Sequence, residues 1–239
     1  MSLVFATKKL LMFKNLEKKE VLFWGSILLL STLKITIGDV SFYDTIDPSI
    51  DFFDGLKDWY RWAYHFFSTF ILFAVIPGVI VKTVLKKSLK EIGVTLGDWK
   101  FGLSAFVVLC LVAAYPVYNS SFNEEHLQFY PLTTLATKTP LLFLLWSLTY
   151  LPHYIGWELF FRGYIGFESK SRYGIVAGIA IPTLLTTLMH IGKPSGELWG
   201  ALVLGIIMGA ITFRSRSILW ILMFHWYLGI LNSYFCGTV

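Results

Sequence analysis

Six polar or ionisable side chains stand out in the second half of the chain because each lies inside a long apolar stretch or at its end. They are His153, Glu158, Arg162, His190, His225 and Asn232. Such groups are costly in apolar surroundings unless they are paired, so they are candidates for function. A carboxylate, two imidazoles and an amide can together position a water, take its proton and stabilise an oxyanion. This set of residue types therefore indicates hydrolysis by an activated water.

The spacing of these residues predicts which of them share a helix face. Glu158 and Arg162 are four residues apart, so they lie on one face. The pair could be structural and neutralise two costly charges, or Arg162 could hold Glu158 as a carboxylate for proton transfer, and both roles are compatible. His225 and Asn232, seven residues apart, also share a face. His190 ends its apolar stretch, a position at which a lone histidine is usually an interfacial residue.

The composition predicts the elements that carry these side chains. Of 239 residues, 56% are hydrophobic and only 15% are charged, against about 25% charged residues in a soluble domain. We therefore expect an all-α, polytopic membrane helix bundle, whose helices satisfy their own backbone groups in lipid. About seven apolar segments approach the ~20 residues that a spanning helix needs. They are 21–38, 61–81, 101–118, 140–167, 173–190, 198–213 and 217–236.

The loop charges predict the orientation. Basic residues cluster before the first segment and after the second, fourth and sixth: Lys8, Lys9, Lys14, Lys18, Lys19, Lys82, Lys86, Lys87, Lys90, Lys100, Lys170, Arg172, Arg214 and Arg216. The opposite loops are mostly acidic: Asp44, Asp47, Asp51, Asp54, Asp58, Glu124 and Glu125. The positive-inside rule then places the N-terminus in the cytoplasm and the C-terminus outside. These clusters account for the net charge of +5, so we expect no nucleic-acid partner. Lys34 and His65 lie near segment ends, from which their side chains can reach water.

At the candidate residues the chain resembles the CAAX-protease and bacteriocin-processing family of intramembrane proteases. That family shows Glu-Glu-x-x-x-Arg, then Phe-x-x-x-His, then His-x-x-x-Asn or Asp, and Glu158, Arg162, His190 and His225 follow this order. The likeness covers about 85–239. We expect a first part, 1–84, with an N-terminal cytoplasmic segment and two spans, and a second part, 85–239, that is a CAAX-protease-like membrane domain. The connector at 89–100 also resembles that of the family, and its apolar residues interleaved with charges predict that it lies on the lipid headgroups.

The chain departs from the family pattern at three positions. Trp157 replaces the first Glu of the pair, the one that the family uses to activate water. Thr186 replaces the Phe four residues before the central His. Gly229 stands where the family has Asn or Asp, and Asn232 follows about one turn later. No H-E-x-x-H motif of zinc metalloproteases and no G-x-S-x-G motif of serine hydrolases occurs.

The resemblance implies that Glu158 and His190 activate water, while His225 and Asn232 bind the oxyanion. Arg162, His153 and Trp157 are the supporting residues. Two His and one Glu, namely His190, His225 and Glu158, could also ligate zinc with an open fourth position, so metal and glutamate chemistry both stay open.

The function implied by the family is that of an intramembrane endopeptidase in the plasma membrane of a bacterium. Its partners would be membrane lipids and a peptide or protein substrate. The alternative is a catalytically inactive relative that serves as a membrane scaffold or as a bacteriocin-immunity-type binding protein. The histidines favour the first reading, whereas Trp157 favours the second.

The expected depths of the candidate residues differ. At 1.5 Å per residue, Glu158 and His225 lie roughly 12–15 Å from the cytoplasmic ends of their segments, and His190 lies roughly 25 Å from its own. The three side chains meet only if the fifth helix is tilted, begins below the membrane or is bent at Pro182. Pro152 could bend the fourth helix in the same way.

Overall fold

The computed structural model describes residues 18–46 and 56–238, and every regular element in these ranges is helical. Several charges used to predict the orientation lie outside the described residues: Lys8, Lys9, Lys14, Asp47, Asp51 and Asp54. The α-helices are α2 (Lys18–Ile35), α3 (Val40–Ile46), α4 (Leu56–Phe70), α5 (Ile76–Thr83), α6 (Trp99–Ser120), α7 (Glu124–Leu127), α8 (Pro140–Glu158), α9 (Glu168–Tyr173), α10 (Ile175–Leu188), α11 (Ser195–Ser215) and α12 (Leu219–Thr238). Two π-helices, η1 (Ile71–Val75) and η4 (Leu159–Phe167), and two 3₁₀-helices, η2 (Leu89–Ile92) and η3 (Thr134–Thr137), complete the set.

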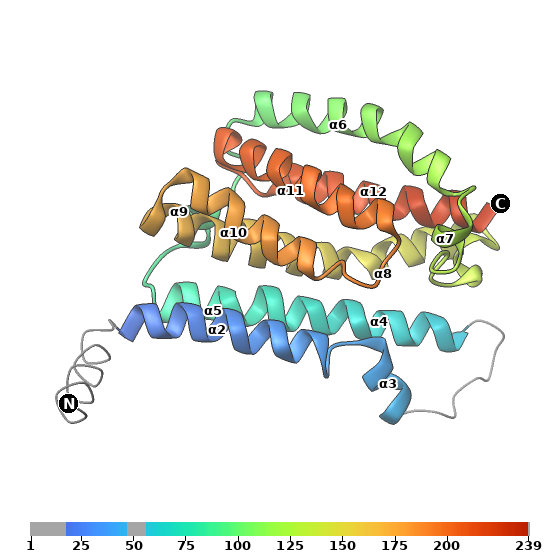
Figure 1. The fold of residues 1–239 in the computed structure, drawn as a ribbon, viewed down its shortest axis with the longest axis horizontal. Coiled ribbons are helices and arrows are strands. Elements are labelled where there is room, and N and C mark those ends of the chain that lie inside the picture. The colour runs from blue at the N-terminus through green and yellow to red at the C-terminus, as the bar shows by residue number, and fades with distance from the viewer. Residues whose placement is uncertain (1–17, 47–55, 239) are drawn as a thin grey trace, which may run out of the picture.

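The long helices run roughly side by side (Figure 1). The run α4–η1–α5 packs on α8 and against α2, and α8 in turn contacts α12. α10 packs on η4 and on α11, while α6 covers α12 at the far edge. α8 and η4 therefore lie in the middle of the bundle, between the α4 layer and the α12 layer.

Four helices or helical runs are long and apolar enough to cross a membrane: Leu56–Thr83, Trp99–Ser120, Ser195–Ser215 and Leu219–Thr238. α2 and α3, which are bent by 58° at the break between them, make a fifth if the pair is one span. The expected number of seven spans is thus not confirmed by length and composition. The all-α class is confirmed for the described residues, and each of the seven apolar segments is largely helical.

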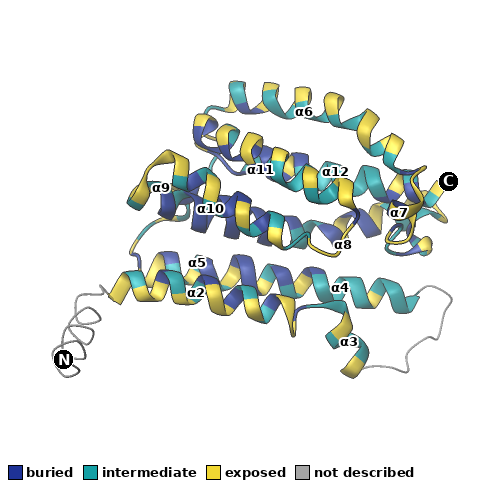
Figure 2. Cartoon of the chain, viewed as in Figure 1, coloured by how far each residue is buried: buried dark blue, intermediate teal, exposed yellow. Residues whose placement is uncertain are grey.

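The central run comprises α8, η4 and α9 without a break from 140 to 173. Thr139 begins it by accepting a hydrogen bond from the Leu142 N–H, and Pro140 takes the first position, where its missing N–H is harmless. Every residue from 156 to 166 is buried, and Figure 2 shows how buried residues concentrate in this part of the bundle. Small residues permit this close packing, because a Cβ on Gly156 would lie 2.6 Å from the backbone oxygen of Thr69 in α4.

The connector between α5 and α6 differs in part from the sequence expectation. Leu96 and Trp99 are exposed, as expected for a segment on headgroups, but Ile92 is fully buried in the apolar core. The connector is also bonded to the turn between α11 and α12, because the Ile218 N–H donates to the Gly93 carbonyl at 2.9 Å. It is therefore a packed part of this end of the bundle.

Candidate active site

The carboxylate of Glu158 is the centre of the candidate site. It is the last residue of α8, directly before the π-helical segment η4, and it is fully buried. Its Oε1 accepts a hydrogen bond from Nδ1 of His225 in α12 at 2.6 Å and one from Nη1 of Arg162 at 3.3 Å. π-helical segments are frequent at functional sites. The predicted Glu158–Arg162 pair is thus formed, and His225 joins it.

The hydrogen bond also orients the imidazole of His225. Because a carboxylate only accepts, the hydrogen is on Nδ1, and Nε2 is the nitrogen that can face a water or a substrate. The ring of Tyr154, one turn before Glu158, lies 4.9 Å from that of His225 between ring centroids.

The second carboxylate oxygen, Oε2 of Glu158, is buried and has no hydrogen-bond partner among the described residues. Buried polar atoms nearly always have a partner in the protein or an ordered water. This oxygen is therefore the place at which a water or a polar substrate group can bind. It is also an atom that can accept a proton.

His190 lies at the same level as Glu158. It follows α10 in a turn, and its Nδ1–H donates to the Thr186 carbonyl at 2.7 Å, which leaves Nε2 open. Its ring centroid is 5.9 Å from that of Trp157, the residue next to Glu158. The sequence expected such an approach only if the fifth helix is tilted, bent or begins below the membrane, and the helix ends observed here show where the extra length lies. The fourth helix continues past 167 to Tyr173 and turns at Gly174, so that Glu158 and His190 are each sixteen residues from the turn (174 − 158 and 190 − 174).

Trp157 fills the space beside His190. Its ring stacks on His153 at 5.5 Å between centroids and meets His190 nearly edge-on, at 89°. Only 8% of the residue is exposed, and its Nε1 is buried without an acceptor among the residues described. The indole thus separates His190 from His153.

His153 belongs to a polar chain that reaches the first helices. Its ring stacks on His65 at 5.6 Å between centroids, and His65 lies 3.1 Å from the ammonium of Lys34. The expectation that Lys34 reaches water from its helix end is wrong. Only 4% of Lys34 is exposed, because its ammonium turns inward and donates to the Gly38 carbonyl at 2.8 Å.

Asn232 takes its contacts elsewhere. Its Oδ1 lies 2.7 Å from Nε2 of His126 in α7 and 3.5 Å from the sulfur of Cys236. His126 in turn faces Glu197, with 3.7 Å between Nδ1 and Oε1. The structure therefore places Asn232 in a second polar cluster and not with the Glu158–His225 pair. Sequence reasoning passed over His126 because it follows Asn123, Glu124 and Glu125 in a stretch that reads as a polar loop.

Tyr154 is a further residue that the sequence did not single out. A Cβ on Gly229, the position at which the family has Asn or Asp, would lie 1.8 Å from the Tyr154 hydroxyl. The phenol thus occupies the space that a longer side chain at 229 would need. Two features of the sequence could have indicated this contact: the small residue Gly229 in the last apolar segment, and a Tyr one helical turn before Glu158.

The donors present do not fit a metal ion. Among the described residues, no group of three or more His, Cys, Asp or Glu side chains gathers as a metal site requires. Glu158 directs Oε1 to Arg162 and His225, and His190 is separated from the next histidine by an indole ring. The zinc alternative therefore finds no ligand set in the described part of the chain.

The fold and the pair formed by the buried Glu158 carboxylate and the partly buried His225 imidazole define an apolar helix bundle with a polar centre. Residues 138–231 of the chain match the family of the type II CAAX prenyl endopeptidase Rce1-like proteins. This match confirms the resemblance found in the sequence, and it spans α8 to most of α12 with Glu158, His190 and His225. The apolar helices and this family identify an integral membrane protein. No curated protein and no solved structure matches the chain.

Proposed function

We propose that this protein is an intramembrane endopeptidase that cleaves a membrane-associated peptide or protein by attack of an activated water. The observation that carries the proposal is the hydrogen bond between the buried Glu158 and the partly buried His225, with the second carboxylate oxygen buried and without a partner among the described residues, inside the segment that matches a peptidase family. The family supports a peptidase in general terms, and the roles of individual residues below belong to the proposal.

In this mechanism Glu158 and His190 prepare the water. Oε2 of Glu158 and Nε2 of His190 are the two open acceptor atoms, and one of them takes a proton as the water oxygen bonds to the peptide carbonyl carbon. When the tetrahedral intermediate collapses, the C–N bond breaks and this proton goes to the leaving amine.

The oxyanion needs hydrogen-bond donors. His225 supplies one as an imidazolium, whose positive charge the Glu158 carboxylate stabilises and whose Nε2–H points away from that carboxylate. Because Asn232 is bonded to His126, we assign the second donor to the Tyr154 hydroxyl, which takes the space at Gly229. Arg162 donates to Oε1 of Glu158 and so holds the carboxylate in position.

The second candidate is the non-catalytic function, a membrane scaffold or a bacteriocin-immunity-type binding protein. One observation favours it. Trp157 takes the position of the family's water-activating Glu, and its indole packs between His153 and His190. A relative with this substitution could bind a partner at the same helices without cleaving it.

The topology that goes with this function has seven spans, a cytoplasmic N-terminus and an outside C-terminus, in a bacterial plasma membrane. It is supported by the distribution of charge in the bundle. Lys87 and Arg172 both pair with Glu168 at one end, where Arg214 also pairs with Asp98. Glu125 and Glu197 lie at the other end, near α7 (Figure 1). The division at residue 84/85, and lipids and a peptide substrate as the partners, belong to the same proposal.

An activity assay tests the proposed function. The purified full chain in lipid nanodiscs is offered a broad panel of lipid-modified and unmodified peptides, with and without chelator. We expect cleavage by the wild type, and Glu158→Gln should lower turnover roughly 10²–10⁴-fold, since it keeps the shape and removes the base. Glu124→Gln, at the exposed start of α7, is the matched control.

Two outcomes would replace the proposal. Equal cleavage by the wild type and by Glu158→Gln would leave Glu158 as a structural partner of Arg162. If the wild type cleaves no peptide while its cellular role survives both His190→Ala and His225→Ala, the non-catalytic function takes its place.

A further inference from the structure

A pocket separate from the candidate site opens at the end of the bundle that carries the basic residues. It has a volume of about 420 Å³ and is lined by Lys87, Glu91, Phe167, Glu168, Lys170 and Ser171. It lies where the connector and η2 meet the junction of η4 and α9. Phe167 follows Glu158 by nine residues, at the other end of the π-helical segment η4. The pocket is therefore not part of the Glu158–His225 site.

The buried charge in the pocket is already satisfied. Glu168 is only 2% exposed, and its two carboxylate oxygens pair with Lys87 and with Arg172. Arg172 is held in turn by Glu20 of α2 at 2.6 Å. This cluster joins α2, α9 and the connector, so it fixes one wall of the pocket and leaves Glu168 and Lys87 little capacity for a ligand.

Lys170 is the cation that remains. Its ammonium lies 4.5 Å from the centroid of the Phe213 ring and forms no ion pair with any described residue. Ser171, the next residue in the chain, also lines the pocket and carries a hydroxyl. An ammonium held over an aromatic ring, with a hydroxyl in the same pocket, can bind a phosphate through a charge-assisted hydrogen bond.

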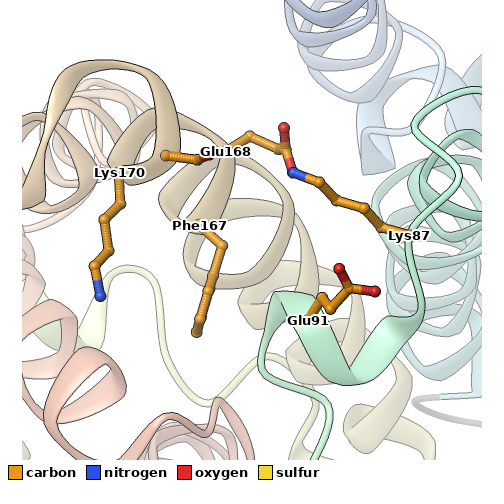
Figure 3. A pocket seen from close by; sticks show the side chains of 6 residues that line it. Lys87, Glu91, Phe167, Glu168 and Lys170 are labelled. Atoms are coloured by element: carbon orange, nitrogen blue, oxygen red, sulfur yellow. The ribbon is translucent and has the colours of Figure 1, made fainter.

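Glu91 provides the opposite charge. The backbone N–H and the hydroxyl of Ser88 donate to its Oε2 at 2.8 and 2.9 Å, which holds the pKa of this exposed carboxyl below its usual value. The carboxylate is thus ionised at neutral pH. In Figure 3 the Lys170 ammonium and the Glu91 carboxylate lie on opposite sides of the Phe167 ring.

We infer that this pocket binds the zwitterionic headgroup of an amine-bearing phospholipid, with its phosphate at Lys170 and Ser171 and its primary ammonium at Glu91. The two charges have the signs needed to bind the phosphate and the ammonium of a phosphoethanolamine group, and the lining carries no net excess of either sign, which disfavours a purely anionic ligand. The volume is in the range of small-ligand sites. Exposed apolar side chains stand close in sequence to the lining residues, at Val84 before Lys87 and at Ile175 and Val176 after Ser171, and acyl chains can lie on them.

Native mass spectrometry of the detergent-purified full chain tests this inference. Phosphatidylethanolamine, phosphatidylcholine and phosphatidylglycerol with identical acyl chains are titrated in parallel. We expect phosphatidylethanolamine to bind most tightly. The choline group of phosphatidylcholine has no N–H to donate a hydrogen bond to Glu91, and the glycerol group of phosphatidylglycerol has no positive charge. Lys170→Gln and Glu91→Gln should each weaken that binding roughly two- to fivefold, as expected for partly exposed charge contacts.

The controls are Lys90→Gln and Glu124→Gln, which remove the same charges at exposed positions outside the pocket. Gln at 91 retains the capping contact with Ser88, so the connector stays folded. Equal binding of the three lipids would overturn the inference, as would a preference for phosphatidylglycerol that only Lys170→Gln reduces. Full displacement by soluble phosphoethanolamine at the same concentration as the lipid would assign the pocket to a soluble ligand instead.

Discussion

Nδ1 of His225 and Oε1 of Glu158 lie 2.6 Å apart, although 67 residues separate them in the chain. This hydrogen bond joins α12 to the central run at the residue where its α-helical part ends. Because the same carboxylate oxygen accepts from Arg162, three charge-capable groups form one closed unit in the apolar interior. The unit holds the fold together at the place where the proposed chemistry occurs, and the two roles can be separated by mutation.

Arg162→Met should destabilise the protein strongly. Arg162 is only 4% exposed, and its removal leaves the fully buried Glu158 with His225 as its single hydrogen-bond partner among the described residues. Breaking a buried pair from one side costs about 3–5 kcal/mol, since an uncompensated charge remains. Unfolding in mixed micelles would measure the loss, and the double variant Arg162→Met/Glu158→Gln should recover part of it. Strictly additive losses would mean that the two side chains do not act as a unit.

Gly156→Ala tests the packing that holds the central run against α4. A Cβ at 156 would lie 2.6 Å from the Thr69 oxygen and 2.9 Å from its carbonyl carbon, both of which are backbone atoms. We expect a loss of about 1–3 kcal/mol of unfolding free energy, because the helices must move apart. Gly200→Ala in α11 is the control, since no atom lies within 4 Å of the new Cβ. There the higher helix propensity of Ala should leave stability unchanged or slightly raised.

The sequence predicted the helices and part of the site. The apolar segments, the Glu158–Arg162 pair and the need of His225 for a polar partner all follow from periodicity and from the cost of lone charges. The position of His190 along the bundle could not be predicted in this way. It depends on the helical run continuing to Tyr173, whereas the charged stretch 168–173 has the composition of a loop. A charged helix end is permitted there since Glu168 and Arg172 pair with each other and with Glu20.

Side-chain contacts between helices could not be predicted from the sequence for a different reason. Asn232 and His225 share a face by spacing, yet Asn232 is bonded to His126, which is 106 residues earlier. The contact of Tyr154 with Gly229 likewise joins two different helices, α8 and α12. These side-chain contacts depend on which helices pack against each other. A single sequence does not reveal that packing.

Trp157→Glu should raise peptidase activity. It restores the Glu pair of the family at a position whose ring now contacts His153 and His190, so the new carboxylate would lie beside a second proton acceptor. The measurement is turnover on the best substrate of the wild type or, if the wild type is silent, on the whole peptide panel. Trp157→Gln opens the same space without a base and should give no gain. Equal activity of the Glu and Gln variants would show that the indole only blocks access.

Reporter fusions after residues 55, 90, 125 and 238 should read outside, inside, outside and outside. The basic connector lies between the second and third apolar segments, and retention of Lys and Arg in the cytoplasm places residue 90 inside. Glu124 and Glu125 follow the third segment at the opposite end of the bundle, so residue 125 should be outside.

Residue 238 ends α12, one of the four helices long and apolar enough to span a membrane. The central run from 140 to 173 decides the count, because it is not among the helices long and apolar enough to span a membrane, whereas the proposed topology needs it to cross. Replacing Lys86, Lys87 and Lys90 together by Gln should weaken the inside signal at 90, whereas the same change at Lys57 and Lys138 should not. An inside reading at 238 would mean an even number of crossings between the connector and the C-terminus, and α12 would then not present His225 to Glu158 from the direction proposed.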